Sequence, residues 1–225
     1  MGRNKSRADP GIGAYRKKMD GLVYFKDASQ LFSPAIAGWT DNIDVGKGTS
    51  KGAEFLYEKT GETFIYKIAY TLSETNRLFT GVNKGLPFPA KFDRRHILNA
   101  DFHYILNENE RRSISLTGLI TYQSGLWETV PSGEFPAKML FGKESVFMDY
   151  YTSTNNFRMP PYARVDLGLS IQLKSKHPQE LNVGIYNILD RHNPFTITYD
   201  DENKEWKKIS LLPIMPSISY HVAFN

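Results

Sequence analysis

Residues 112–122 read RSISLTGLITY, and this stretch decides the fold class because its apolar and polar side chains alternate. The even-numbered positions include Ile114, Leu116, Ile120 and Tyr122, and the odd-numbered positions include Ser113, Ser115, Thr117 and Thr121. We call each such set of alternate positions along a strand a parity. Successive side chains of a β-strand point to opposite faces, so a period of two predicts a strand with one apolar and one polar face.

The same alternation recurs along the chain, in 63–72, 97–106, 163–173 and 217–224. No window of comparable length has the i, i+3, i+4 apolar spacing of an amphipathic helix, so the chain is predicted to be all-β. The expected strands cover 11–19, 21–27, 43–60, 62–79, 94–107, 111–128, 160–175, 179–199 and 205–224. Most exceed the usual ~5–6 residues of soluble strands and reach the ~9–11 that a tilted strand needs to cross a bilayer.

The predicted connections fall into two classes that alternate. Short turns are expected at Asp20-Gly21, Gly61-Glu62, 107–110 and 176–178, and long loops at 28–42, 80–93 and 129–159. Short turns at one edge and long loops at the other are typical of an outer-membrane β-barrel. If the chain forms such a barrel, the apolar positions of each strand face lipid and the polar positions line a water-filled lumen. The lipid-facing set is Leu98, Phe102, Ile114, Leu116, Val165, Leu167, Val222 and Phe224; the lumen-facing set is Asn99, Asp101, Ser115, Thr117, Arg164, Asp166 and Gln172.

Composition excludes several classes of protein. The 225 residues include no cysteine, so there is no disulfide framework, zinc ribbon or thiol nucleophile. No window approaches 18 consecutive apolar residues, as a membrane-spanning helix requires, and the N-terminus has no apolar core of a signal peptide. The net charge of +4 comes from the first 18 residues, which hold six basic side chains against Asp9; the remainder sums to −1. Nucleic acid is therefore not an expected partner.

Several blocks of the chain, in this order, resemble the C-terminal part of TonB-dependent outer-membrane receptors. They are Gly52-Ala53-Glu54, Leu86-Pro87-Phe88-Pro89 leading into 93–99 (DRRHILN), 122–127 (YQSGLW), 159–167 (MPPYARVDL), 184–195 (GIYNILDRHNPF) and 212–217 (LPIMPS). The resemblance covers residues 11–225, and residues 1–10 are expected to be disordered or non-native.

This resemblance implies a transmembrane antiparallel barrel of 22 strands around a plug, of which about nine strands are expected here. It implies energy-coupled uptake of a large nutrient, such as a glycan or a siderophore, across the outer membrane of a Gram-negative bacterium. The chain is expected to be a C-terminal fragment without the plug. The expected partners are outer-membrane lipid, the missing strands and plug, the TonB energy-coupling complex through that plug, and a surface lipoprotein. No enzyme activity and no cofactor are expected.

Motifs that suggest other chemistry have simpler interpretations. His96 and His103 are seven residues apart on one predicted strand, so they face opposite sides and cannot share a metal ion. The glycine-lysine run at 46–52 precedes a strand, where a phosphate loop requires a helix. Residues 93–96 (DRRH) are interpreted as an anchor at the barrel rim. The carboxylates of Glu54, Asp101 and Asp166 fall on polar parities of separate strands, and no catalytic residue is assigned.

The predicted loop 129–159 is the candidate ligand-contact segment, because it is rich in aromatic side chains that can stack on a ligand. The candidates are Trp127, Phe135, Phe141, Phe147, Tyr150, Tyr151 and Phe157. They have an alternative interpretation, which is packing among themselves or at the membrane interface. For the whole chain, the alternative is a soluble β-sandwich or small barrel that binds carbohydrate or another small ligand; a glycosidase is a third possibility, which requires an acid pair in a cleft.

Overall fold

Long β-strands dominate the chain, as the alternating pattern predicts. The structure is a computed structural model that describes residues 7–25, 43–138, 145–200, 203 and 205–224. The strands are β1 (Arg7–Phe25), β2 (Ile43–Thr60), β3 (Phe64–Leu78), β4 (Phe88–Pro89), β5 (His96–Glu108), β6 (Arg112–Gln123), β7 (Trp127–Glu128), β8 (Gly133–Lys138), β9 (Ser145–Tyr150), β10 (Phe157–Arg158), β11 (Tyr162–Leu173), β12 (Gln179–Tyr186), β13 (Pro194–Asp200), β14 (Glu205–Ser210) and β15 (Met215–Val222). One 3₁₀ turn, η3 (Asn83–Gly85), precedes β4.

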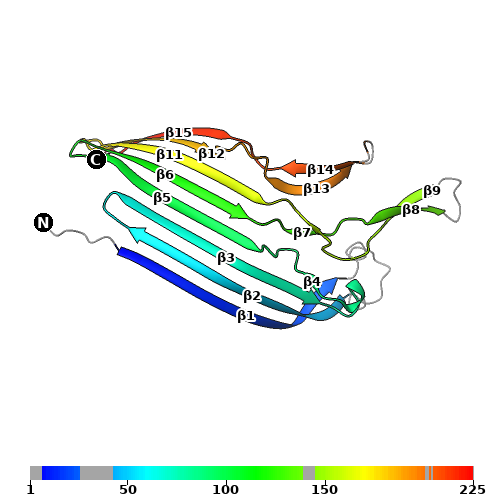
Figure 1. Cartoon of the computed structure of the whole chain (residues 1–225). Coiled ribbons are helices and arrows are strands. Elements are labelled where there is room, and N and C mark those ends of the chain that lie inside the picture. The colour runs from blue at the N-terminus through cyan, green and yellow to red at the C-terminus, as the bar shows by residue number, and fades with distance from the viewer. Residues whose placement is uncertain (1–6, 26–42, 139–144, 201–202, 204, 225) are drawn as a thin grey trace.

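The main sheet is antiparallel and has the order β1-β2-β3-β5-β6-β11-β12-β15, with β4 paired to the end of β3 (Figure 1). Three two-stranded ribbons, β7–β10, β8–β9 and β13–β14, lie in the connections. Within the described ranges, β1 and β15 each pair on one side only, so the sheet is open at both edges.

The predicted separation of short and long connections is confirmed for the turns near 61–62, 107–110 and 176–178 and for the loops 80–93 and 129–159, whereas the loop predicted at 28–42 lies outside the described residues. Strands β2 and β3, β5 and β6, and β11 and β12 are joined by turns of a few residues at one edge of the sheet. The connections that follow β3, β6 and β12 lie at the opposite edge and carry β4 and the three ribbons (Figure 1). We call these two ends of the strands the short-turn edge and the loop edge; they are distinct from the open sides of the sheet at β1 and β15.

The turn predicted at Asp20-Gly21 is wrong. β1 continues through it as one strand, with Asp20 opposite Lys47 and Leu22 opposite Gly46. Gly21, at φ +70°, is the extra residue of a β-bulge, and glycine adopts this angle without strain. In the described part of the chain the main sheet therefore has eight strands along its path, with the short β4 paired beside β3, where nine long strands were expected. β1 also includes residues 7–10, which were expected to belong to a disordered or non-native segment.

The continuous strands expected over 179–199 and 205–224 are also wrong, because the chain leaves the sheet at Asn187. This residue has φ +53° and is fully buried. Its Nδ2 donates to the carbonyl oxygens of Arg191 at 3.1 Å and Leu212 at 3.3 Å. These bonds join the two ends of the β13–β14 excursion, so the chain returns to the sheet at β15.

Cross-strand register divides the sheet into two chemically different faces. One row across six strands consists of Phe64, Tyr104, Leu116, Leu169, Val183 and Ile218. On β3, β6 and β11 the alternate positions that lie on this face are mainly apolar over a length of nine residues each, 64–72, 114–122 and 163–171. The opposite face has rows such as Ser115, Ser170, Asn182 and Ser219. We call them the apolar face and the polar face.

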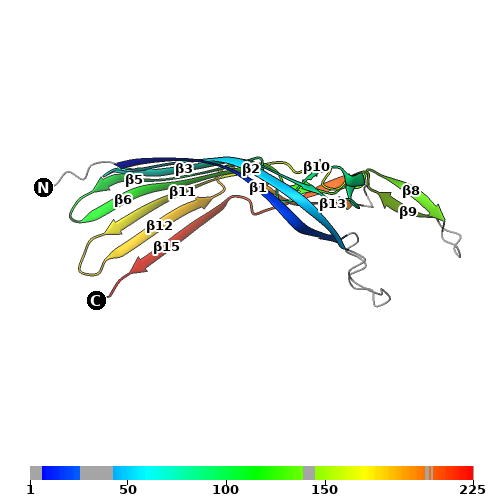
Figure 2. The same ribbon diagram turned by 90° about the horizontal axis from the view of Figure 1, so that it is seen from below.

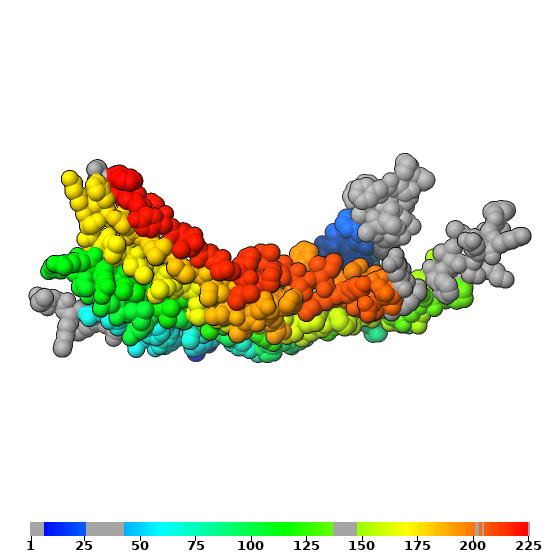
Figure 3. All heavy atoms as spheres, turned by 90° about the horizontal axis from the view of Figure 1, so that it is seen from above, coloured from blue at the N-terminus to red at the C-terminus, as the bar shows by residue number. Residues whose placement is uncertain are grey.

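The molecule buries very little apolar material. Among the described residues only Phe79, Val82, Phe88, Ala90 and Met159 are buried apolar side chains. The accessible surface is 16197 Å², whereas a compact monomer of this size exposes roughly 10,400 Å². The main sheet is a single curved layer in Figures 2 and 3, with no second sheet stacked on it in the described part of the chain. This arrangement contradicts the alternative of a sandwich with a dry core.

The one helical segment among the described residues, η3, is too short to cross a membrane as a helix.

Candidate functional site

The seven side chains predicted to face the lumen all have the parity of the polar face. Register aligns Asn99 with Thr121 and Arg164, and Asp101 with Leu119 and Asp166. Two hollows open on this face, one near the short-turn edge around Ser115 and one toward the loop edge around Arg164. The polar face is therefore also the hollowed face.

Arg164 is the centre of a polar cluster in the second hollow. Its Nη1 donates to the hydroxyl oxygens of Tyr162 at 3.0 Å and Tyr186 at 3.1 Å. Its guanidinium carbon lies 4.4 Å from the centre of the Tyr186 ring, within range of a cation–π interaction. Its Nε lies 3.0 Å from Asp166 Oδ2, while the backbone N–H of Asn187 donates to Asp166 Oδ1 at 2.8 Å. Side chains from two strands thus hold this charge in a fixed position.

The predicted lipid-facing residues share the apolar face, apart from one at the C-terminal end. Leu98, Phe102, Ile114, Leu116, Val165, Leu167 and Val222 all have the parity of this face. Phe224 lies beyond the end of β15, is 81% exposed, and has its ring centroid 5.8 Å from that of His177. It therefore contacts the β11–β12 turn and does not extend the strand.

The structure divides the aromatic residues proposed for ligand contact into three groups. Trp127 and Phe157 lie at the base of the loop, in β7 and β10. Phe135 and Tyr150 lie on one face of the β8–β9 ribbon, and Tyr151 has the parity of the other face. Phe141 lies outside the described residues, as does the side chain of Phe147. The five described residues of this set do not form one aromatic platform.

A different set of aromatic side chains meets at the loop edge. A hollow between the β8–β9 and β13–β14 ribbons is lined by Tyr151, Tyr199, Trp206, Glu134 and Asp149, among others. The rings of Tyr199 and Trp206 are 5.3 Å apart, and Trp206 and Tyr151 are 47% and 54% exposed. Glu134 and Asp149 are direct cross-strand partners, so two carboxylates face the same hollow. We call it the aromatic-acidic hollow.

Sequence reasoning missed Tyr199 and Trp206. They belong to segments interpreted as continuations of long wall strands, in which aromatic residues are expected at the membrane interface. A detectable signal was the polar, proline-containing stretch 190–194 (DRHNP), which fits a turn better than the middle of a strand through a membrane.

Residues 93–96 have structural partners, in agreement with their interpretation as an anchor. Asp93 Oδ1 accepts the backbone N–H of Thr75 at 2.7 Å, and Arg94 Nη1 donates to the carbonyl oxygen of Ser124 at 3.2 Å. His96 Nδ1 lies 2.7 Å from the Tyr70 hydroxyl oxygen. The four side chains hold strand ends together and do not converge on one another.

The histidines and the glycine-lysine run are placed as follows. His96 and His103 pair with Leu72 and Ile65, which lie on opposite faces of β3. In the described part of the chain, no group of three or more His, Asp or Glu side chains is placed to hold a metal ion. The glycine-lysine run at 46–52 lies inside β2, where a Cβ on Gly46 would approach the carbonyl oxygen of Leu78 to 2.3 Å.

Comparison with known proteins adds one finding. A family model described as "TonB dependent receptor-like, beta-barrel" matches residues 11–188, which is most of the chain. No curated protein and no solved structure matches it significantly.

Proposed function

The chain belongs to the TonB-dependent receptor-like β-barrel family, and we propose that its main sheet is part of a barrel wall that imports one large nutrient. This is a family of outer-membrane receptors and transporters of Gram-negative bacteria that work in a TonB-coupled context, not a family of enzymes. The single observation that carries the proposal is the open, two-faced sheet, in which a band nine residues long on each of three strands has apolar side chains at alternate positions and matches the thickness of a bilayer.

The two faces have different environments in this proposal. The apolar face meets lipid, and the polar face meets water and a plug inside the lumen. Further strands pair with β1 and β15, because an unpaired strand edge in lipid leaves N–H and C=O groups unsatisfied at a cost of several kcal/mol each. The plug contacts the TonB complex and the loop edge is extracellular, where a surface lipoprotein can approach it.

The aromatic-acidic hollow supports a glycan as the nutrient, in preference to an anionic siderophore complex. Exposed rings of Tyr151 and Trp206 offer flat apolar surfaces for sugar rings. Glu134 and Asp149 are acceptors for sugar hydroxyl groups, and their negative charges repel an anionic ligand.

A double alanine variant at the loop edge, compared with a single alanine variant as control, tests this proposal. Trp206→Ala with Tyr151→Ala is expected to reduce glycan binding by tenfold or more, in cells that carry the protein in their outer membrane. Phe135→Ala is the matched control, because it removes an exposed aromatic from the opposite face of the same ribbon. Equal binding by both variants contradicts the assigned site.

The membrane assignment has its own test. The protein is expected to stay in the membrane pellet after extraction with sodium carbonate. Recovery in the supernatant as a cooperatively unfolding monomer contradicts the barrel-wall proposal and favours a soluble binding module.

A further inference from the structure

A belt of basic side chains borders the apolar face on the side of the loop edge. Arg16 of β1 is opposite Lys51 of β2, and Lys51 is opposite Glu74 of β3. Lys18 lies two residues beyond Arg16 and therefore has the same parity. All three have the same facing as Ile12, Phe55 and Leu72, which lie nearer the centre of the sheet, so the cations and the apolar side chains share one face.

Glu74 organises the belt by holding two of its cations. Lys51 Nζ lies 3.1 Å from Glu74 Oε2, and Arg95 Nη1 donates to the same oxygen at 3.0 Å. Asn76 Nδ2 donates to the other oxygen of Glu74 at 2.8 Å. One carboxylate therefore fixes an ammonium and a guanidinium side by side, and neither is buried: the Lys51 and Arg95 side chains are 67% and 38% exposed.

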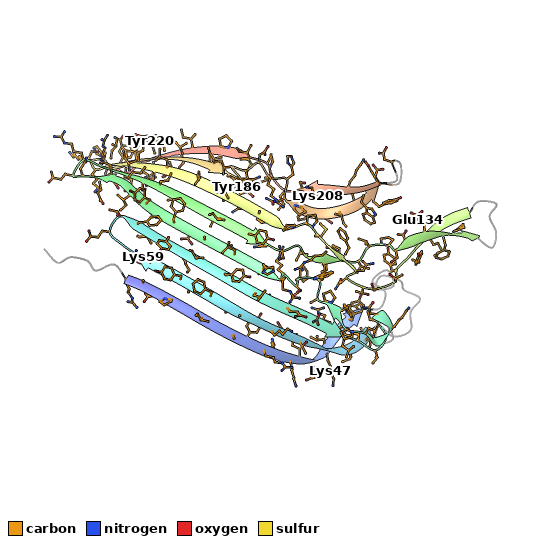
Figure 4. All side chains as sticks on the ribbon, viewed as in Figure 1. Lys47, Lys59, Glu134, Tyr186, Lys208 and Tyr220 are labelled. Atoms are coloured by element: carbon orange, nitrogen blue, oxygen red, sulfur yellow. The ribbon has the colours of Figure 1, made fainter. Side chains whose placement is uncertain are left out.

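The belt has an excess of positive charge. Arg16, Lys18, Lys47, Lys51 and Arg95 contribute five positive charges, while Glu74 and Asp20 contribute two negative ones. Lys47, labelled in Figure 4 near the loop edge, lies 3.8 Å from Asp20, and both side chains are more than three-quarters exposed. The surface therefore offers several unneutralised donors to an anion.

We infer that this belt binds the phosphate groups of a phosphorylated lipid in the outer leaflet, with the acyl chains of that lipid lying along the adjoining apolar face. The inference depends on the proposed membrane placement and adds a specific lipid site to it. Phosphate is the anionic group that lies at the boundary of a bilayer, and each Lys or Arg near such a surface adds about five-fold to binding. The fixed pair of Lys51 and Arg95 can donate to two oxygens of one phosphate.

Lipid A that carries two phosphates is the probe for the test. The full protein is purified from outer membranes, exchanged into phosphatidylcholine vesicles, and titrated with lipid A, with dephosphorylated lipid A, or with inorganic phosphate. Binding of intact lipid A is expected, with at least tenfold weaker binding of the dephosphorylated form and no competition from millimolar inorganic phosphate. Equal binding of both lipids, or full competition by inorganic phosphate, overturns the inference.

Lys17 is the matched control, because it lies between Arg16 and Lys18 but has the parity of the other face. Lys18→Gln is expected to weaken lipid A binding about five-fold, and Lys17→Gln to leave it unchanged. Arg16→Gln, Lys18→Gln and Lys51→Gln together are expected to weaken it on the order of a hundred-fold. Equal affinity of the Lys17 and Lys18 variants overturns the site.

Two controls keep a failure interpretable. Each variant must show the gel mobility shift on heating that marks a folded barrel, and Lys51→Arg, which keeps the charge, must restore a folded phenotype if Lys51→Gln lacks it. A protein that stays in the carbonate pellet but ignores lipid A contradicts the lipid site alone. A protein released by carbonate contradicts the barrel-wall proposal instead.

Discussion

Replacing Leu116 with arginine separates a lipid-facing sheet from a two-sided soluble one. Leu116 lies between Tyr104 and Leu169 on the apolar face, two positions from Gly118 at the centre of the 114–122 band. A residue advances about 3.4 Å along a strand, or about 2.4 Å along the membrane normal at a tilt of 45°. Leu116 is therefore placed about 5 Å from the midplane.

The expected cost follows from this depth. Arginine on the lipid face costs about 2–4 kcal/mol at the midplane and about 0–1 kcal/mol near the interfaces, so Leu116→Arg should lower the unfolding free energy by about 2 kcal/mol. Thr117 is the adjacent residue and points to the polar face, where its Oγ1 donates to the carbonyl oxygen of Gly168 at 3.3 Å. Thr117→Arg should lose only that bond, about 0.5–1 kcal/mol.

The assay is denaturant unfolding of the membrane-inserted protein in lipid vesicles, with the folded fraction read from gel mobility. A depth series strengthens it: Leu167→Arg, at the centre of the 163–171 band, should cost about 3 kcal/mol, and Val222→Arg, near the end of β15, less than about 1 kcal/mol. Equal damage from Leu116→Arg and Thr117→Arg, or no dependence on depth, refutes the assignment of the apolar face to lipid.

Three further predictions test packing and charge in the sheet. Gly118→Val should destabilise the fold by about 1–3 kcal/mol because a Cβ there lies 2.2 Å from Phe102 Cε1, and Phe102→Leu in the same chain should recover part of the loss on the heat-shift gel. Glu74 lies beyond the apolar band, and hydrogen bonds from Asn76 first and Lys51 next lower its pKa from 4.5 to about 2. Its ionised form therefore contributes stability that is complete above pH 4.5 and is lost as the pH falls toward 2; Glu74→Gln should flatten that part of a melting-temperature profile. Arg164→Met should cost about 1–3 kcal/mol by leaving Asp166 without its cation, and Arg164→Lys should restore only part because it lacks the planar group that contacts two tyrosines, as denaturant unfolding can show.

The facing of each strand was predictable because it depends on neighbouring residues alone. Side chains alternate along a strand whatever it pairs with, so the parity of Asn99 or Leu167 follows from the printed sequence. Three short turns and the long connections at 80–93 and 129–159 were predictable for the same reason, since they depend on where the alternation stops, whereas the long connection after β12 was not predicted. The error at Asp20-Gly21 shows the limit: the dipeptide fits a turn and a bulge equally well, and pairing with Lys47 and Gly46 selects the bulge.

Residues that meet through the loops could not be predicted. Tyr199 and Trp206 reach the same hollow as Glu134 and Tyr151 because two ribbons that are distant in the chain, β8–β9 and β13–β14, lie side by side at the loop edge. No local pattern specifies that approach, since it depends on the bonds of Asn187 that turn the chain out of the sheet.

The sequence by itself therefore determined the all-β class, the two faces and the family resemblance, because each rests on short-range periodicity or on the order of local motifs. Only the tertiary structure decided which strands are neighbours, where β1 bulges, and which charges meet. Arg16 and Lys51 of the basic belt and the Glu74 that holds Lys51 come from three different strands. The register of these strands is set by many backbone hydrogen bonds together. Cross-strand register is a long-range property: a slip of one residue would move Lys51 away from Glu74 without changing any local pattern.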